Sequence, residues 1–149
     1  MIIAGGAYHE QCQFPLDSAF FGSGVRAAAA IENIVSSRNQ LHTCIGHADK
    51  ETLEAYAAAF DFDVHITEIP ETVTFDYLHN HSNPVLSPSG ASNYNRKLSG
   101  ISGDAILRFG LVEGTAIVSG KRVVYDPQST DPVPFDSNGS TAEELALVL

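Results

Sequence analysis

Three short apolar runs alternate with two helix-like segments near the start of the chain, and no other pattern restricts the fold as strongly. The runs are Ile2–Ala4, Leu41–Gly46 and Val64–Ile69. Each has the length of a buried strand, and each ends at or next to a Gly or a Pro. This β-α-β-α-β order predicts an α/β fold, a Rossmann-like parallel sheet with flanking helices.

Both helical segments place apolar residues on one face. Asp49 is a candidate N-cap of the second helix. The first face comprises Ala27, Ile31, Ile34 and Val35, and the second comprises Leu53, Tyr56, Ala57 and Phe60. We expect these faces to pack on the sheet.

The pattern changes after this first part. Val73, Phe75 and Tyr77 alternate with other residues, as in a strand with two different faces. The Ser-, Asn- and Pro-rich stretch Asn80–Ser92 has the composition of a loop or flap. We therefore predict a lid within residues 72–95, formed as an antiparallel excursion from the edge of the sheet.

The last third of the chain is harder to order. The main sheet is expected to resume at residues 105–107 and 123–125, but a link of about a dozen residues is short for a helical crossover. The topology between 104 and 126 is therefore left open. Ser140–Glu143 matches a capping box and predicts a C-terminal helix. Its apolar face would be Leu145, Val148 and Leu149, and we expect residues 1–149 to be the N-terminal portion of one larger, truncated domain.

Composition narrows the class of protein. The net charge of −10, with scattered Lys and Arg, argues against nucleic-acid binding. There is no apolar run of the roughly 20 residues that span a bilayer, and no basic segment of a secretory signal, so we expect no membrane partner and a cytoplasmic protein. Cys12 and Cys44 are predicted to be buried thiols, with no structural metal.

Two segments have the residue types of a ligand site. Glu10 follows the first predicted strand, at the carboxyl edge where open α/β sheets bind ligands, although its spacing also fits a solvated loop acid. An ionised Glu accepts hydrogen bonds, which suits a polyol. Gly22-Ser23-Gly24 opens a helix whose first N–H groups point outward, and Arg26 lies in the first turn, where it suits an anionic ligand or an exposed surface position equally.

The histidines raise a different class of function. His79 and His81 form an HxH pair that a metal-dependent hydrolase could use, but three ligands at defined spacing are the rule for catalytic zinc. The chain has no GxSxG elbow, Walker A motif or GxGxxG sequence.

Taken in order, these segments resemble the N-terminal half of a ribokinase-like (PfkB-type) carbohydrate kinase. In that family a first strand leads to a substrate-binding acid, a Gly-Gly segment opens a helix that carries an Asn, and a β-strand lid leaves the sheet. The matching segments are Glu10, five residues after Gly5, then Phe21–Ala28, Val73–His79, Val123–Gln128 and Asn138–Ser140, the last resembling the start of the helix before the family's Asn-x-x-Glu motif.

The resemblance implies which residues bind substrate. They are Glu10, Gly22, Ser23, Gly24, Arg26 and Ala27, with Thr74, Asp76 and Tyr77 in the lid. Three positions depart from the family: Glu10 replaces an Asp, Ser23 replaces the second Gly, and Ala27 replaces the Asn. A nucleoside-like or anionic acceptor would be consistent with these changes.

The resemblance also implies an activity for the whole protein. The chain would be the substrate-binding half of an ATP-dependent kinase for a sugar, a sugar-like compound or a nucleoside. Because the family's Asn-x-x-Glu and Gly-x-Gly-Asp motifs are absent from the sequence, no catalytic residue is assigned, and the ATP and Mg²⁺ sites would lie mostly outside it. The expected partners are a small sugar-like substrate and, through the lid strands, a second copy of the chain. A non-catalytic Rossmann-like module that binds a small ligand or a partner, and the metal-dependent hydrolase, are the alternatives.

Overall fold

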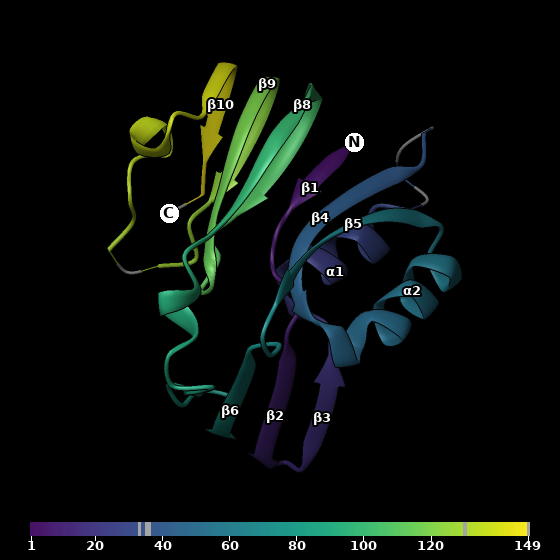
Figure 1. Ribbon diagram of the computed structural model, residues 1–149, viewed down its shortest axis with the longest axis vertical. Coiled ribbons are helices and arrows are strands. Elements are labelled where there is room, and N and C mark those ends of the chain that lie inside the picture. Colours follow the sequence, from purple (N-terminus) through teal and green to yellow (C-terminus); the bar gives the residue numbers. More distant parts are fainter. Residues whose placement is uncertain (33, 35–36, 130, 149) are drawn as a thin grey trace.

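A computed structural model describes residues 1–32, 34, 37–129 and 131–148, which form a large and a small β-sheet (Figure 1). Every pairing in the large sheet is parallel, in the order β10-β9-β8-β1-β4-β5. Its strands are β1 (Ile2–Ala4), β4 (Asn39–Gly46), β5 (Phe62–Ile69), β8 (Arg96–Phe109), β9 (Gly114–Asp126) and β10 (Thr141–Leu147). The small sheet has the order β3-β2-β6-β7, with β2 (His9–Phe14), β3 (Asp17–Phe20), β6 (Thr74–His79) and β7 (Val85–Ser87).

The predicted β-α-β-α-β order is confirmed by β1, β4 and β5 with the helices α1 (Gly22–Ala30) and α2 (Lys50–Ala59). Both helices cover one face of the large sheet, in a core that includes the fully buried Ile3, Val25 and Leu53. This core accounts for the apolar runs recognised in the sequence.

The first helix is shorter than its periodicity predicts. It ends at Ala30, so Ile34 is 77% exposed instead of packed, and Val35 lies outside the described residues. The second helix begins after Asp49 as predicted, but the Asp49 side chain makes no capping hydrogen bond and instead contacts His9. Asp49 therefore makes a tertiary contact with His9 instead of the local N-cap hydrogen bond that its position favours.

The open topology between 104 and 126 is resolved by two bent strands. Arg96 pairs with Gly114 and Phe109 pairs with Asp126. A straight strand of 14 residues would be about 45 Å long, whereas the chain from Phe109 to Gly114 reaches at most about 18 Å. Strand β8 must therefore fold back on itself, and β9, paired along its length, must do the same.

The bend lies where Gly103 pairs with Gly120. A Cβ atom on Gly120 would lie 2.7 Å from a methyl group of Val123 and 3.0 Å from one of Ile106. Residues three apart in a straight strand are about 10 Å apart, so the chain turns sharply at this point. The first halves of β8 and β9 thus form a second β-layer.

This second layer covers the face of the large sheet that the helices leave open. Its core comprises Leu98, Ile101, Ala116 and Val118 from the first halves, packed with residues such as Ala4, Ile106, Val123 and Tyr125. The first half of β9, instead of a helix, thus makes the crossover between the parallel second halves of β8 and β9.

The predicted C-terminal helix is wrong. Residues 141–147 form strand β10, which pairs with β9 from Thr141 opposite Ser119 to Leu147 opposite Tyr125, and Leu149 lies outside the described residues. The open edge of β9 supplies a complete ladder of backbone hydrogen bonds, which the Ser140–Glu143 capping box alone does not match.

The small sheet also differs from the prediction. Pro15 lies in the turn of an antiparallel hairpin between β2 and β3, which the sequence did not indicate. Strand β6 pairs parallel with β2 and antiparallel with β7, in a sheet separate from the large one, so it is not an antiparallel strand at the large sheet's edge. Within Asn80–Ser92, residues 85–87 form β7.

Candidate functional site

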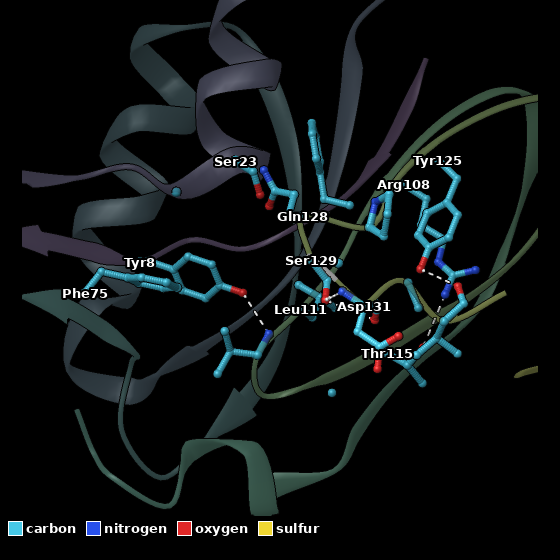
Figure 2. A pocket seen from close by; sticks show the side chains of 18 of the residues that line it. Tyr8, Ser23, Phe75, Arg108, Leu111, Thr115, Tyr125, Gln128, Ser129 and Asp131 are labelled. Carbon is cyan, nitrogen blue, oxygen red and sulfur yellow. Dashed lines mark hydrogen bonds between the residues drawn. The ribbon is translucent and has the colours of Figure 1, made fainter. Parts of the chain in front are cut away.

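A cleft of about 870 Å³ lies against the small sheet, the start of α1 and the segments that follow β8 and β9 (Figure 2). In this view Tyr8 and Phe75 lie at one end, and Arg108, Thr115 and Tyr125 lie at the other, with Gln128, Ser129 and Asp131 between them. The volume lies in the range of small-molecule sites, roughly 300–1,000 Å³.

Glu10 lines the cleft from strand β2, not from a loop after β1. Its Oε1 accepts a hydrogen bond of 3.1 Å from the backbone N–H of Gly22, and its Oε2 accepts one from Arg26. The side chain remains 27% exposed. A carboxylate has about four acceptor positions, so this one is oriented by the protein and can still accept hydrogen bonds from a ligand.

Two glycines at the start of α1 are each required for a different structural reason. Gly22 has φ of +70°, and a Cβ there would lie 2.6 Å from the carbonyl oxygen of Gly6. Gly24 does not line the cleft; it lets α1 approach the backbone of Gly5, whose oxygen would lie 2.7 Å from a Cβ on Gly24. The protein's own backbone, not a ligand, occupies the space beside Gly24.

Ser23 and Arg26 both line the cleft, whereas Ala27 packs in the helix-side core. The Ser23 hydroxyl is buried and has no hydrogen-bond partner among the described residues. The Arg26 guanidinium lies 5.1 Å from the centre of the Phe21 ring. Of the six substrate-binding residues predicted, the structure brings four together at the cleft: Glu10, Gly22, Ser23 and Arg26.

Strand alternation decides which residues of β6 face the cleft. Phe75 pairs in register with Glu10, and Tyr77 lies two residues further on the same face; both line the cleft. Thr74 and Asp76, also predicted, do not line it. Burial, followed by the neighbouring Glu10 charge, raises the pKa of the Tyr77 phenol, which places that ring near the carboxylate.

A buried pair that the sequence analysis missed closes one end. The Tyr8 hydroxyl donates a 2.9 Å hydrogen bond to Oε2 of Glu113 and accepts one from the backbone N–H of Val112. Glu113 is 0% exposed, and its other oxygen has no partner among the described residues. Burial raises the pKa of Glu113 to about 7, with hydrogen bonds from the backbone and Tyr8 opposing the rise.

Arg108, also missed, closes the other end. It is 5% exposed and lies 4.4 Å and 5.3 Å from the ring centres of Tyr125 and Phe135. One sequence signal was available, since a base in the middle of the apolar run Ala105–Phe109 requires a partner in the fold.

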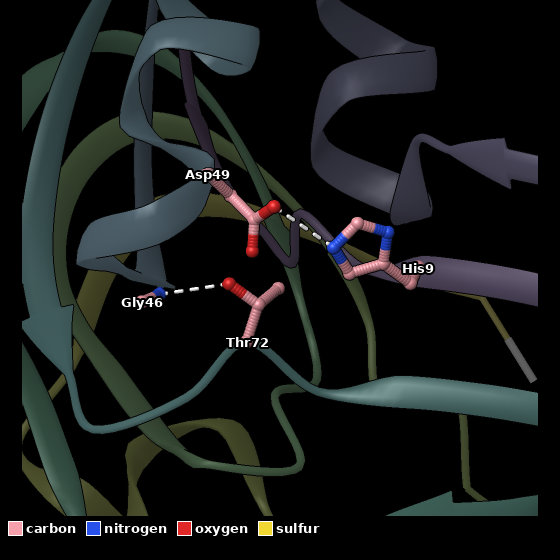
Figure 3. Close-up of polar contacts among 4 residues, drawn as sticks. All are labelled: His9, Gly46, Asp49 and Thr72. Carbon is pink, nitrogen blue, oxygen red and sulfur yellow. Dashed lines mark hydrogen bonds and ion pairs between the residues drawn. The ribbon is translucent and has the colours of Figure 1, made fainter.

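Two contacts tie the small sheet to the large one (Figure 3). Nε2 of His9 lies 3.0 Å from Oδ1 of Asp49, at the start of α2. The Thr72 hydroxyl accepts a 2.8 Å hydrogen bond from the N–H of Gly46, at the end of β4. The small sheet is thereby held against the end of β4 and the start of α2.

The histidine pair lies in the turn after β6. The His81 N–H donates to Nδ1 of His79 over 3.1 Å. Across the described residues, no three side chains of His, Cys, Asp or Glu gather as a metal site would require. Within the same residues, no helix is long and apolar enough to cross a membrane.

Comparison with known proteins decides the fold. No protein-family model and no curated protein matches the sequence. Solved structures do match. A pyrophosphate-dependent kinase of the ribokinase family, complexed with a pyrophosphate analogue and myo-inositol, covers 85% of this chain with a TM-score of 0.52 and 12% identity. The nucleoside kinase of Methanocaldococcus jannaschii, an archaeal member of that family, covers 85% with a TM-score of 0.51 and 12% identity.

The chain has the ribokinase-like fold. A further pyrophosphate-dependent kinase of the ribokinase family, in a sulfate complex, covers 93% of the chain with a TM-score of 0.51 and 11% identity. The chain spans 61% of the inositol-bound kinase, 61% of the nucleoside kinase and 66% of the sulfate complex. The predicted resemblance is confirmed at the level of the fold, a parallel six-stranded sheet with two helices.

Proposed function

We propose that the cleft binds the acceptor of a phosphoryl-transfer reaction, a sugar, sugar-like polyol or nucleoside, and that the chain is the substrate-binding half of a cytoplasmic ATP-dependent kinase. One observation carries the proposal: Glu10 is held at the cleft by both Gly22 and Arg26, facing the aromatic Phe75 and Tyr77 of the small sheet. The ribokinase-like fold supports the same class.

The chemistry of the cleft fits a polyhydroxyl ligand. The ionised Glu10 accepts hydrogen bonds and cannot donate them, so it favours hydroxyl groups over carbonyls. The unpartnered hydroxyl of Ser23 gains a partner when a ligand hydroxyl lies against it. The ring faces of Phe75 and Tyr77 provide an apolar wall for the C–H face of such a ligand.

ATP and Mg²⁺ belong to the proposal only for the whole protein. The described residues bring together no group of three His, Cys, Asp or Glu side chains for an ion, and we assign no step to either cofactor. We expect the 149-residue chain to bind the acceptor without transferring phosphate, as an assay of ATP-dependent product formation would show.

Isothermal titration calorimetry with myo-inositol, D-ribose, D-glucose and adenosine tests the proposal. At least one should bind, and Glu10→Gln should weaken that binding by about tenfold or more, because a hydrogen bond to a charged group is lost. The matched control is Glu51→Gln, which removes an equal charge from an exposed position on α2. Absence of binding by all four compounds, or equal binding by both variants, would refute the assignment.

We also propose a homodimer through the small sheet. Four large apolar side chains of this sheet and its turn are exposed: Phe14 (68%), Leu16 (90%), Leu78 (55%) and Val85 (71%). Light scattering should give twice the mass of the chain for the wild type and the monomer mass for Leu16→Asp. A wild-type monomer at high concentration would rule the dimer out.

A further inference from the structure

The Arg108 end of the cleft contains a positive charge that is buried. Arg108 is 5% exposed, and the described residues offer it no carboxylate within 4 Å. A buried charge is costly unless it is paired, and removal from water lowers the pKa of this guanidinium. The aromatic rings and neutral acceptors around Arg108 compensate only part of this cost.

The hydrogen bonds of Arg108 leave one edge of the guanidinium free. Nη1 donates to the carbonyl oxygen of Phe135 over 3.0 Å and to the Ser140 hydroxyl over 3.1 Å. Within the part of the chain that the structure describes, Nη2 has a single 3.5 Å contact, with the Thr115 hydroxyl, and the buried Nε has no partner. Nε and Nη2 form the edge whose two parallel N–H groups bind a carboxylate or phosphate in bidentate fashion.

The surroundings hold that edge in place. The rings of Tyr125 and Phe135 lie against the guanidinium, which restricts its rotation. The Thr115 hydroxyl accepts a 2.7 Å hydrogen bond from Nδ2 of Asn138, and Arg108, Thr115 and Asn138 all line the cleft. The edge thus belongs to a built polar site and not to a mobile surface side chain.

We infer that this end of the cleft binds an oxyanion, a phosphate or a carboxylate, carried by the same acceptor whose hydroxyl groups contact Glu10. The inference rests on the proposed function and narrows its substrate class to an anionic polyol, such as a sugar phosphate or a sugar acid. Glu10 and Arg26 are already paired with each other, whereas Arg108 has no ionic partner among the described residues. Asp131, which also lines the cleft (Figure 2), is a carboxylate that could pair with Arg108 in place of a ligand.

Paired ligands test the inference in calorimetry. D-Glucose 6-phosphate, or D-glucuronate, should bind at least about tenfold more tightly than D-glucose, because a charge-assisted bidentate contact is added. The two anionic sugars distinguish phosphate from carboxylate recognition. Inorganic phosphate alone should bind more weakly than the sugar phosphate. Equal affinity for the neutral and both anionic sugars would overturn the inference.

Two variants assign the effect to Arg108. Arg108→Lys keeps the charge but cannot present two parallel N–H groups, so it should weaken binding of the anionic sugars by a larger factor than binding of D-glucose. The control is Lys121→Gln, which removes a positive charge from an exposed side chain paired with Asp104. Asp131→Asn should keep or strengthen the anion preference; its loss would mean that Asp131 holds the ligand.

A measurement on the wild type covers the case in which Arg108→Lys fails to fold. The Nε–H signal of Arg108 in ¹H–¹⁵N NMR should shift on titration with D-glucose 6-phosphate and not with D-glucose. No shift with the sugar phosphate overturns the inference. Binding of D-glucose that depends on Glu10, without any anion preference, removes this inference and leaves the proposed function standing. If inorganic phosphate binds but none of the sugars does, whether neutral or anionic, both this inference and the proposed function are wrong.

Discussion

Replacing the buried Glu113 by Gln should change how the stability of the protein depends on pH. Glu113 is 0% exposed, and burial raises its pKa from the ordinary 4.5 to about 7. At about 1.36 kcal/mol per pKa unit, this difference corresponds to at most about 3–4 kcal/mol of unfolding free energy. Few single carboxylates in a small domain contribute as much.

The sign of the effect follows from which state holds the proton. Below pH 4.5 both the folded and the unfolded chain carry a protonated Glu113, so its contribution to stability is fully present. Between pH 4.5 and about 7 the unfolded chain loses the proton first, so stability falls as pH rises. Above about pH 7 to 8 the folded protein carries a buried carboxylate, and the contribution is lost.

Urea denaturation at pH 5 and pH 8 measures this contribution. Far-UV circular dichroism is the suitable signal, because the chain has no tryptophan. The free energy of unfolding of Glu113→Gln, relative to the wild type, should increase from pH 5 to pH 8 by roughly 2–3 kcal/mol. The difference isolates Glu113 from the other acids, whose titration is common to both proteins.

The control variant is Glu144→Gln, at an exposed position of β10. Its stability relative to the wild type should be the same at both pH values. If the free energy of unfolding of Glu113→Gln also differed from that of the wild type by the same amount at both pH values, Glu113 would be ionised normally in the folded protein. The buried Tyr8–Glu113 pair would then be open to water.

Three further outcomes follow from the packing. Gly22→Ala should lower stability by more than about 2 kcal/mol in urea titrations, since a Cβ would lie 2.6 Å from a backbone oxygen, whereas Gly100→Ala, at φ +73° but in open space, should cost only about 1–2 kcal/mol. Thr72→Val should cost about 1–3 kcal/mol, because the N–H of Gly46 loses its buried acceptor; an unchanged urea midpoint would show that water replaces it. Burial raises the pKa of Cys44 to about 12, so mass spectrometry should find it unalkylated by iodoacetamide at pH 8 until urea is added; rapid labelling of the native protein would contradict this.

The first part of the fold could be predicted because its signals are local. Ile2–Ala4 and Leu41–Gly46 are uninterrupted apolar runs, and such runs become buried parallel strands wherever helices can cover them. The apolar residues of the second helix, among them Leu53 and Ala57, repeat at helical spacing, which sets the side of that helix that packs on the sheet. No distant partner has to be known for either inference.

The later part could not be predicted in the same way. The Ser140–Glu143 capping box is a correct local signal for a helix, yet the segment from Thr141 onward pairs with β9. The bend at Gly103 and Gly120 has no local signature beyond two glycines, and it is decided by parallel pairing of strands that a few residues connect. Strand pairing is a non-local interaction, so neighbouring residues do not encode it.

The candidate site shows the same division. The sequence alone determined that an acid, Glu10, and a small-residue helix start at Ser23 follow the first strand, because chain order and residue chemistry suffice for that. Only the tertiary structure decided that Phe75 faces them, that Glu113 is buried against Tyr8, and that Arg108 is buried at the opposite end of the cleft from Tyr8. Burial and register depend on segments about a hundred residues apart in the chain coming together, and they determine which polar groups remain available to a ligand.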